Sequence, residues 1–107
     1  MDTLKKQYQF DRVYKRGKSY GNKQLVMYVL NNKKKNNFFG IVISKKVGNS
    51  VKRNRIRRQV KESIRLKNNI KTGQDIIIVV RQQEFDLDYK TISNSINHLL
   101  KKHGLLI

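Results

Sequence analysis

The chain has 107 residues, of which 25 are Lys or Arg and 7 are Asp or Glu, so its formal net charge is +18. This length supports one compact core but not two. A positive charge of this size repels itself in a compact protein, and an anionic partner relieves the repulsion. We therefore expect a single domain over residues 1–107 whose leading partner is nucleic acid, with an acidic membrane surface as the alternative.

Several protein classes are disfavoured by what the sequence lacks. There is no cysteine, so the chain has no disulfide partner, no disulfide framework and no thiolate metal site. The first residues, Met-Asp-Thr-Leu-Lys-Lys-Gln, contain no apolar core of a signal peptide. No stretch approaches the roughly 18 consecutive apolar residues of a membrane span. We expect a soluble, cytoplasmic protein that does not bind membrane.

The N-terminal segment predicts a short helix with an aromatic face. Phe10, Val13 and Tyr14 follow the spacing of three and four residues that places side chains on one side of a helix. Gly17 is typical of the position just after a helix end. The aromatic face has two interpretations, packing in the core or a surface on which other rings stack.

Three apolar runs predict strands. Residues 24–30 are rich in β-forming residues, and residues 38–44 follow after the polar turn 31–37, so we predict that these two strands pair as an antiparallel hairpin. Residues 75–81 form a continuous apolar run that is typical of a central strand covered on both faces. Residues 18–22 could add a short fourth strand.

Two further helices complete the predicted fold. A basic helix should run from about residue 51 to 67, and the last helix should begin near Asp86 and end at Gly104. The last helix places a set of apolar residues and one histidine on one side: Ile92, Ile96, Leu99, Leu100 and His103. The predicted fold is α+β, a two-layer α-β sandwich with a mixed four-stranded sheet and three helices.

The most unusual stretch is residues 45–58, in which half of the residues are Lys or Arg and none is acidic. With Ser50 as the predicted N-cap, Ile56, Val60 and Ile64 form an apolar stripe on the helix that follows. Cations also occupy the first turn, where the helix dipole disfavours them. A merely solvated basic helix is one interpretation, but exposed amide N–H groups among many cations favour a site for an anion, most plausibly phosphate.

The sequence offers no catalytic centre. Glu84, Asp86 and Asp88 precede the last helix, where capping is favoured over a magnesium site. His98 and His103 are five residues apart, which is not the helical spacing of a metal pair. No nucleophile, base and orienting group occur in a recognisable set. The polypeptide is predicted to bind a partner, with no certain metal ligand.

The segment from Ser44 to Arg58 closely resembles the RNR motif of the bacterial ribonuclease P protein component. That motif reads Arg-Asn-Arg-x-Lys-Arg after Ser-Lys-Lys-x-Gly-Asn, so Arg57 replaces a lysine, which keeps the charge and changes the donor geometry. The resemblance extends over essentially the whole chain, through residues 4–17, residues 25–28, residues 75–81 and the last helix.

The resemblance implies a left-handed β-α-β crossover through the basic helix. It also implies a subunit of a ribonucleoprotein endonuclease that matures the 5′ end of tRNA. In that enzyme a large RNA carries out hydrolysis with Mg²⁺ bound mainly by the RNA, so no residue of the protein is catalytic. The implied partners are this catalytic RNA and precursor tRNA.

Two groups of residues match these roles. The surface that binds the catalytic RNA is predicted to comprise Lys45, Lys46, Lys52, Arg53, Asn54, Arg55, Arg57, Arg58, Lys61 and Arg65. The cleft for the single-stranded 5′ leader is predicted to contain Phe10, Tyr14 and Tyr28, on which bases of any sequence can stack. For Tyr28 an ordinary strand aromatic remains the alternative.

Two other functions are compatible with the composition. A ribosomal protein of related fold would use the same basic surface to hold ribosomal RNA. A protein that coats DNA or a membrane surface would bind by charge alone.

Overall fold

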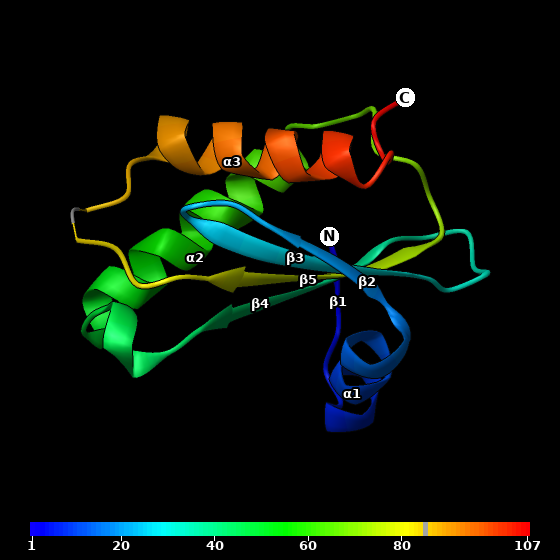
Figure 1. Cartoon of the computed structure of the whole chain (residues 1–107), viewed down its shortest axis with the longest axis horizontal. Helices are drawn as coiled ribbons and strands as arrows, with labels where there is room; N and C mark the ends of the chain where they lie inside the picture. The colour runs from blue at the N-terminus through cyan, green and yellow to red at the C-terminus, as the bar shows by residue number, and fades with distance from the viewer. Residues whose placement is uncertain (85) are drawn as a thin grey trace.

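A computed structural model gives the positions of residues 1–84 and 86–107, and Figure 1 shows their arrangement. The helices are α1 (Gln7–Arg16), α2 (Ser50–Arg65) and α3 (Tyr89–Lys102), together with a short 3₁₀ helix, η1 (Lys45–Val47). The strands are β1 (Asp2–Thr3), β2 (Lys18–Gly21), β3 (Leu25–Asn31), β4 (Phe38–Ile43) and β5 (Gln74–Val80). Of the described helices, none is long and apolar enough to cross a bilayer.

The strands form one mixed sheet in the order β1-β4-β5-β3-β2. The predicted hairpin of residues 24–30 and 38–44 is wrong, because β5 lies between β3 and β4, antiparallel to the first and parallel to the second. The turn that leaves β3 instead crosses the start of β5, where the backbone N–H of Asn32 donates to the Gly73 carbonyl oxygen at 2.8 Å. The most apolar strand thereby gains the central place, in which both of its faces are covered.

The sheet has five strands, whereas four were predicted, because β1 was not predicted from the sequence. This strand has two residues and pairs in parallel with the start of β4, Asp2 opposite Phe38 and Thr3 opposite Phe39. Two residues are too few to show the alternation by which a strand is recognised in a sequence. The predicted short strand at residues 18–22 is present as β2, which pairs with β3.

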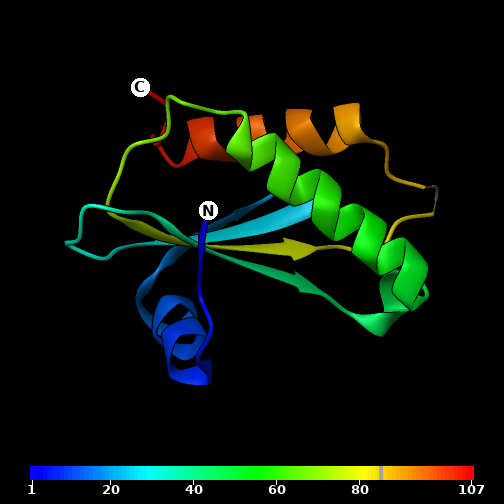
Figure 2. The same ribbon diagram turned by 180° about the vertical axis from the view of Figure 1, so that it is seen from behind.

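The helices divide between the two faces of the sheet, as Figures 1 and 2 show. On the helical face, α2 and α3 pack on the sheet and on each other; on the other side, which we call the open face, α1 covers only part of the strands. Successive residues of β5 alternate between these faces, with Ile78 in the core under α2 and α3 and Ile77 and Val79 on the open face. The α+β sandwich is confirmed, with α1 as an additional element on the open face.

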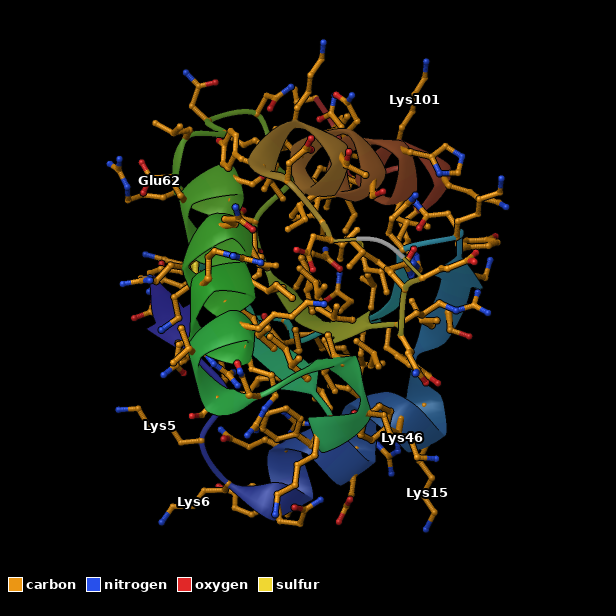
Figure 3. All side chains as sticks on the ribbon, turned by 90° about the vertical axis from the view of Figure 1, so that its left-hand side faces the viewer. Lys5, Lys6, Lys15, Lys46, Glu62 and Lys101 are labelled. Atoms are coloured by element: carbon orange, nitrogen blue, oxygen red, sulfur yellow. The ribbon has the colours of Figure 1, made fainter. Side chains whose placement is uncertain are left out.

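The crossover from β4 through α2 to β5 is left-handed. Figure 3 looks at the ends where β4 and β5 finish; with α2 and α3 above the sheet, β5 lies to the right of β4. About 98% of crossovers between parallel strands in one sheet have the opposite hand. The start of α2 lies just beyond the end of β4, because only η1 and a few residues separate the two elements.

The helix ends differ from the predictions in two details. Asn49 caps α2 in place of the predicted Ser50, because its side-chain Oδ1 accepts the backbone N–H of Lys52 at 2.9 Å. The last helix begins at Tyr89, three residues later than predicted, and the Asp88 side chain accepts the N–H of Thr91 at 2.8 Å.

Gly17 ends α1 for a different reason from the one predicted. Its backbone is extended, with φ of −77°, so it is not the left-handed residue of a typical helix end. A Cβ atom at this position would lie 2.5 Å from the Val13 carbonyl oxygen and 2.8 Å from that of Val29. Glycine therefore lets the end of α1 approach β3 closely.

Candidate nucleic-acid interface

The basic residues are concentrated where β4 leads into α2. The strand ends at Ile43, and η1 carries Lys45 and Lys46 before Asn49 starts the helix. The predicted apolar stripe of α2 is buried, since Ile56 and Val60 are 0% exposed and Ile64 is 4% exposed. Burial of this stripe fixes the rotation of the helix, so the cations of its other faces are held at the surface.

Two arginines of α2 are oriented by backbone carbonyl groups. On the helical wheel Arg53 falls on the side of the apolar stripe, one turn before Ile56. Its Nε donates to the Gly48 carbonyl oxygen at 3.2 Å, which gives this half-buried cation a polar partner. The Arg57 Nη1 donates to the Ile41 carbonyl oxygen on β4 at 3.1 Å. Neutral acceptors restrict the side chains without cancelling their charge, so both guanidinium groups can still attract phosphate.

Few of the predicted RNA-binding cations are neutralised within the described part of the chain. Lys52 pairs with Asp86 at 2.8 Å, and the Arg65 Nε donates to Glu62 at 3.0 Å. The remaining seven have no ion pair among these residues: Lys45, Lys46, Arg53, Arg55, Arg57, Arg58 and Lys61. Asn54, the one uncharged member of the set, is exposed beside them.

The structure separates these cations into two directions. Arg57 and Lys61 face the edge of β4, where they line a small hollow of about 150 Å³ that Phe10 also lines. Lys52 lies instead beside Asp86. Its hydrogen bond and charge are the main cause that lowers the pKa of the Asp86 carboxyl group, and the charge of Arg55 lowers this pKa further. The predicted set is therefore a basic band along η1 and α2 and not one flat patch.

The aromatic residues predicted to line a cleft lie on the open face. Phe10 is half-buried and packs with the buried residues Leu4, Val13 and Ile77. A Cβ atom on Gly40 would lie 2.5 Å from the Phe10 ring, so the glycine of β4 lets this ring rest directly on the strand. Phe10 is therefore partly a core residue, and its outer edge reaches the hollow shared with α2.

Tyr14 and Tyr28 make the second aromatic contact between α1 and the sheet. Their ring centroids are 4.8 Å apart and the ring planes are nearly perpendicular, at 88°. Tyr14 is 39% exposed. Its partial burial is the main cause that raises the pKa of its hydroxyl group, and the electrostatic effects of Tyr28 and Asp11 raise this pKa further. Tyr14 therefore stays neutral at physiological pH, and both tyrosines present ring surface at the open face.

A larger hollow of about 390 Å³ lies beside α1 and is lined by Asp11, Tyr14 and Lys15. Figure 3 shows Lys46 extending from η1 to the α1 side of the sheet, the side on which Lys15 also lies. Asp11 and Lys15 were not predicted as site residues. A helical wheel could have indicated them, because they occupy the face of α1 that adjoins Phe10 and Tyr14.

The position of α1 is fixed by a buried polar contact that the sequence did not reveal. The carboxylate of Asp75, at the start of β5, is almost fully buried; Arg12 Nη2 donates to it at 3.0 Å and Asn32 Nδ2 at 2.9 Å. Arg12 lies on α1, opposite the aromatic side. A buried carboxylate requires such partners, so this contact couples α1 to the central strand.

The remaining polar candidates have structural contacts. Asp88 caps α3 and Asp86 pairs with Lys52, so the predicted capping role holds for one of the three acidic residues before α3. His103 Nε2 lies 2.9 Å from the Met27 carbonyl oxygen, and burial lowers the pKa of its ring. Within residues 1–84 and 86–107, no three His, Asp or Glu side chains gather as metal ligands would.

Known proteins match the chain over nearly its whole length. The family model described as Ribonuclease P matches residues 1–104. The ribonuclease P protein component of Clostridium botulinum (strain Langeland) is 45% identical over 97% of this chain and 96% of its own length. The component from Lachnoclostridium phytofermentans is 48% identical over 98% of this chain and 91% of its own.

Solved structures agree with these matches. The RNase P protein of Staphylococcus aureus aligns with a TM-score of 0.91 and 38% identity, covering 100% of this chain and 99% of the other. The RNase P protein of Thermotoga maritima aligns with a TM-score of 0.84 and 31% identity, covering 95% and 97%. These matches favour the ribonuclease P interpretation over the ribosomal alternative. The chain belongs to the family of bacterial ribonuclease P protein components, the protein subunits of the endoribonuclease that matures the 5′ end of tRNA.

Proposed function

We propose that this chain acts as one RNA-binding domain that holds two RNAs on two adjoining surfaces. The basic band on η1 and α2 binds the catalytic RNA, and the open face beside α1 binds the single-stranded 5′ leader of precursor tRNA. The observation that carries the proposal is the hollow at the edge of β4, where Phe10 meets Arg57 and Lys61. It makes the aromatic and the basic surfaces continuous.

The chemistry of each surface suits its proposed RNA. Seven cations free of ion pairs in the described structure can contact phosphates, and four of them are arginines that can hold a phosphate through two N–H groups. A folded RNA presents many phosphates in fixed positions, which matches a rigid helix. A leader has no fixed sequence, so stacking on Tyr14, Tyr28 and Phe10 is the appropriate contact.

The Mg²⁺ expected from the family is best assigned to the RNA. Three of the seven carboxylates are engaged in the fold, Asp75 by Arg12 and Asn32, Asp86 by Lys52, and Asp88 by the first turn of α3. Among the described residues, no three His, Asp or Glu side chains gather as metal ligands would. The described residues therefore do not fit a resident magnesium site. On this proposal the protein supplies positive charge and positions the leader, while hydrolysis belongs to the RNA. The cytoplasmic location remains a prediction.

Reconstitution tests the proposal. Purified protein is added to a bacterial ribonuclease P RNA and precursor tRNA at low Mg²⁺, where repulsion between the two RNAs is strongest. We expect faster 5′ cleavage than with RNA alone and tighter binding of precursor than of mature tRNA. No gain in cleavage would refute the proposal, and sedimentation of the protein with ribosomal subunits would support the ribosomal alternative instead.

A further inference from the structure

An acidic residue lines the hollow in which the leader is proposed to bind. Asp11 lies on α1 one turn before Tyr14, and both line the hollow of about 390 Å³ together with Lys15. The chain has only seven acidic residues among 107. A carboxylate at a site for a polyanion needs an explanation, because it weakens every phosphate contact nearby.

The fold does not account for Asp11. Three other carboxylates form ion pairs, those of Glu62, Asp75 and Asp86. Asp11 forms none among the described residues, and its position in the middle of α1 gives it no capping role. Its side chain is exposed.

Asp11 is nevertheless oriented. Gln7 Nε2 donates to its Oδ1 at 3.0 Å from the preceding turn of the helix. This contact uses one acceptor site, and an ionised carboxylate has about four. Asp11 is also close enough to Tyr14 to affect its pKa. Burial is the main cause that raises the pKa of the Tyr14 hydroxyl group, and the negative charge of Asp11 raises it further.

We propose that Asp11 reads the base that stacks beside Tyr14, favouring bases with an amino group over uracil. The amino groups of adenine, cytosine and guanine donate N–H bonds to a carboxylate, whereas the two carbonyl oxygens of uracil repel it on either side of its single ring N–H. The negative charge also turns the phosphate of that nucleotide away from the hollow, toward the cations of η1 and α2. The inference rests on the proposed function.

The test uses the reconstituted holoenzyme and precursor tRNAs that differ at one leader nucleotide at a time. Their dissociation constants are measured with the wild-type protein, Asp11→Ala and Asp11→Asn. At one leader position, we expect the wild type to bind the three amino-bearing bases about tenfold more tightly than uracil, the lower end of the effect of one hydrogen bond to a charged group. Asp11→Ala should reduce the preference below about twofold, because the amino-bearing bases lose a hydrogen bond and uracil loses a repulsive charge.

Asp2→Asn is the matched control, because it removes the same charge from β1, outside this hollow. It should keep the base preference. Urea unfolding of Asp11→Ala should match the wild type, since the side chain is exposed. Asp11→Asn should also relax the preference, because an amide can both donate and accept.

The outcomes separate the two proposals. If the wild type binds precursor better than mature tRNA but treats the four bases alike at every leader position, the role of Asp11 is wrong and the proposed function stands. The same conclusion follows if Asp11→Ala keeps the preference. If the wild type shows no advantage for precursor tRNA at all, both the leader site and this inference are overturned.

Discussion

The two faces of the sheet have opposite relations to solvent. On the helical face, α2 and α3 bury a continuous core in which Met27, Ile76 and Ile78 are 0% exposed. On the open face, the buried apolar cluster of the described chain comprises Leu4, Val13 and Ile77, and the apolar residues around it are half-covered. The first arrangement is what stability requires. The second leaves apolar and aromatic surface at the edge of a basic band, which is costly for a monomer and useful for binding RNA.

The largest expected effect comes from comparing adjacent residues of β5. Ile78→Ala removes a fully buried side chain from the helical face and should lower the free energy of unfolding by about 2–5 kcal/mol. Val79→Ala, on the half-buried open face, should cost less than half as much. Urea unfolding measures both. Equal losses would show that the two faces contribute alike to stability.

Removal of an exposed aromatic ring tests the open face as a binding surface. Tyr14→Ala should weaken the binding of precursor tRNA by about 1–3 kcal/mol, the value of one stacked base, and leave that of mature tRNA unchanged. Phe10→Ala should reduce the same advantage and also lower stability, because its ring packs on β4. Binding of both tRNAs to the holoenzyme measures the difference. Equal losses for precursor and mature tRNA would return these rings to a purely structural role.

The basic band should respond to salt and not to the leader. Arg55 is exposed and without an ion pair in the described structure. Arg55→Ala should therefore make the fall of log affinity for the catalytic RNA with log salt concentration less steep, by about 0.7–0.9 in slope. Lys101→Ala removes one charge from the end of α3, outside the band, and serves as the control (Figure 3). An unchanged slope in the arginine variant would show that this residue does not reach phosphate.

The smallest effect concerns the rim of the helical face, where His103 joins α3 to β3. Burial lowers the pKa of His103 below its ordinary value of 6.5, so the unfolded chain binds a proton more readily than the folded one. Stability should therefore be lost as the pH falls from 6.5 through the lowered pKa. Urea unfolding at about pH 7.5 and about pH 5.5 measures this loss, which should be smaller in His103→Gln. Equal losses in the two proteins would exclude His103 as the cause.

The sequence by itself determined the three helices, four of the five strands, the buried stripe of α2 and the family. These features depend on local patterns, namely the spacing of apolar residues and the order of residues 44–58. Phe10, Tyr14 and Tyr28 were predicted as cleft residues from the family resemblance, and the structure brings them to one face, while their role in binding the leader stays a prediction.

Only the tertiary structure decided which strands pair and how the site residues are grouped. The place of β5 between β3 and β4 depends on contacts between distant segments, so adjacency in sequence gave the wrong hairpin. Asn49 and Ser50 are both good caps, and only the backbone geometry selects between them. The division of the α2 cations between the edge of β4 and Asp86, and the place of Asp11 in the hollow, depend on how α1 and α2 are set against the sheet. A one-dimensional pattern does not contain that information, because packing between elements determines it.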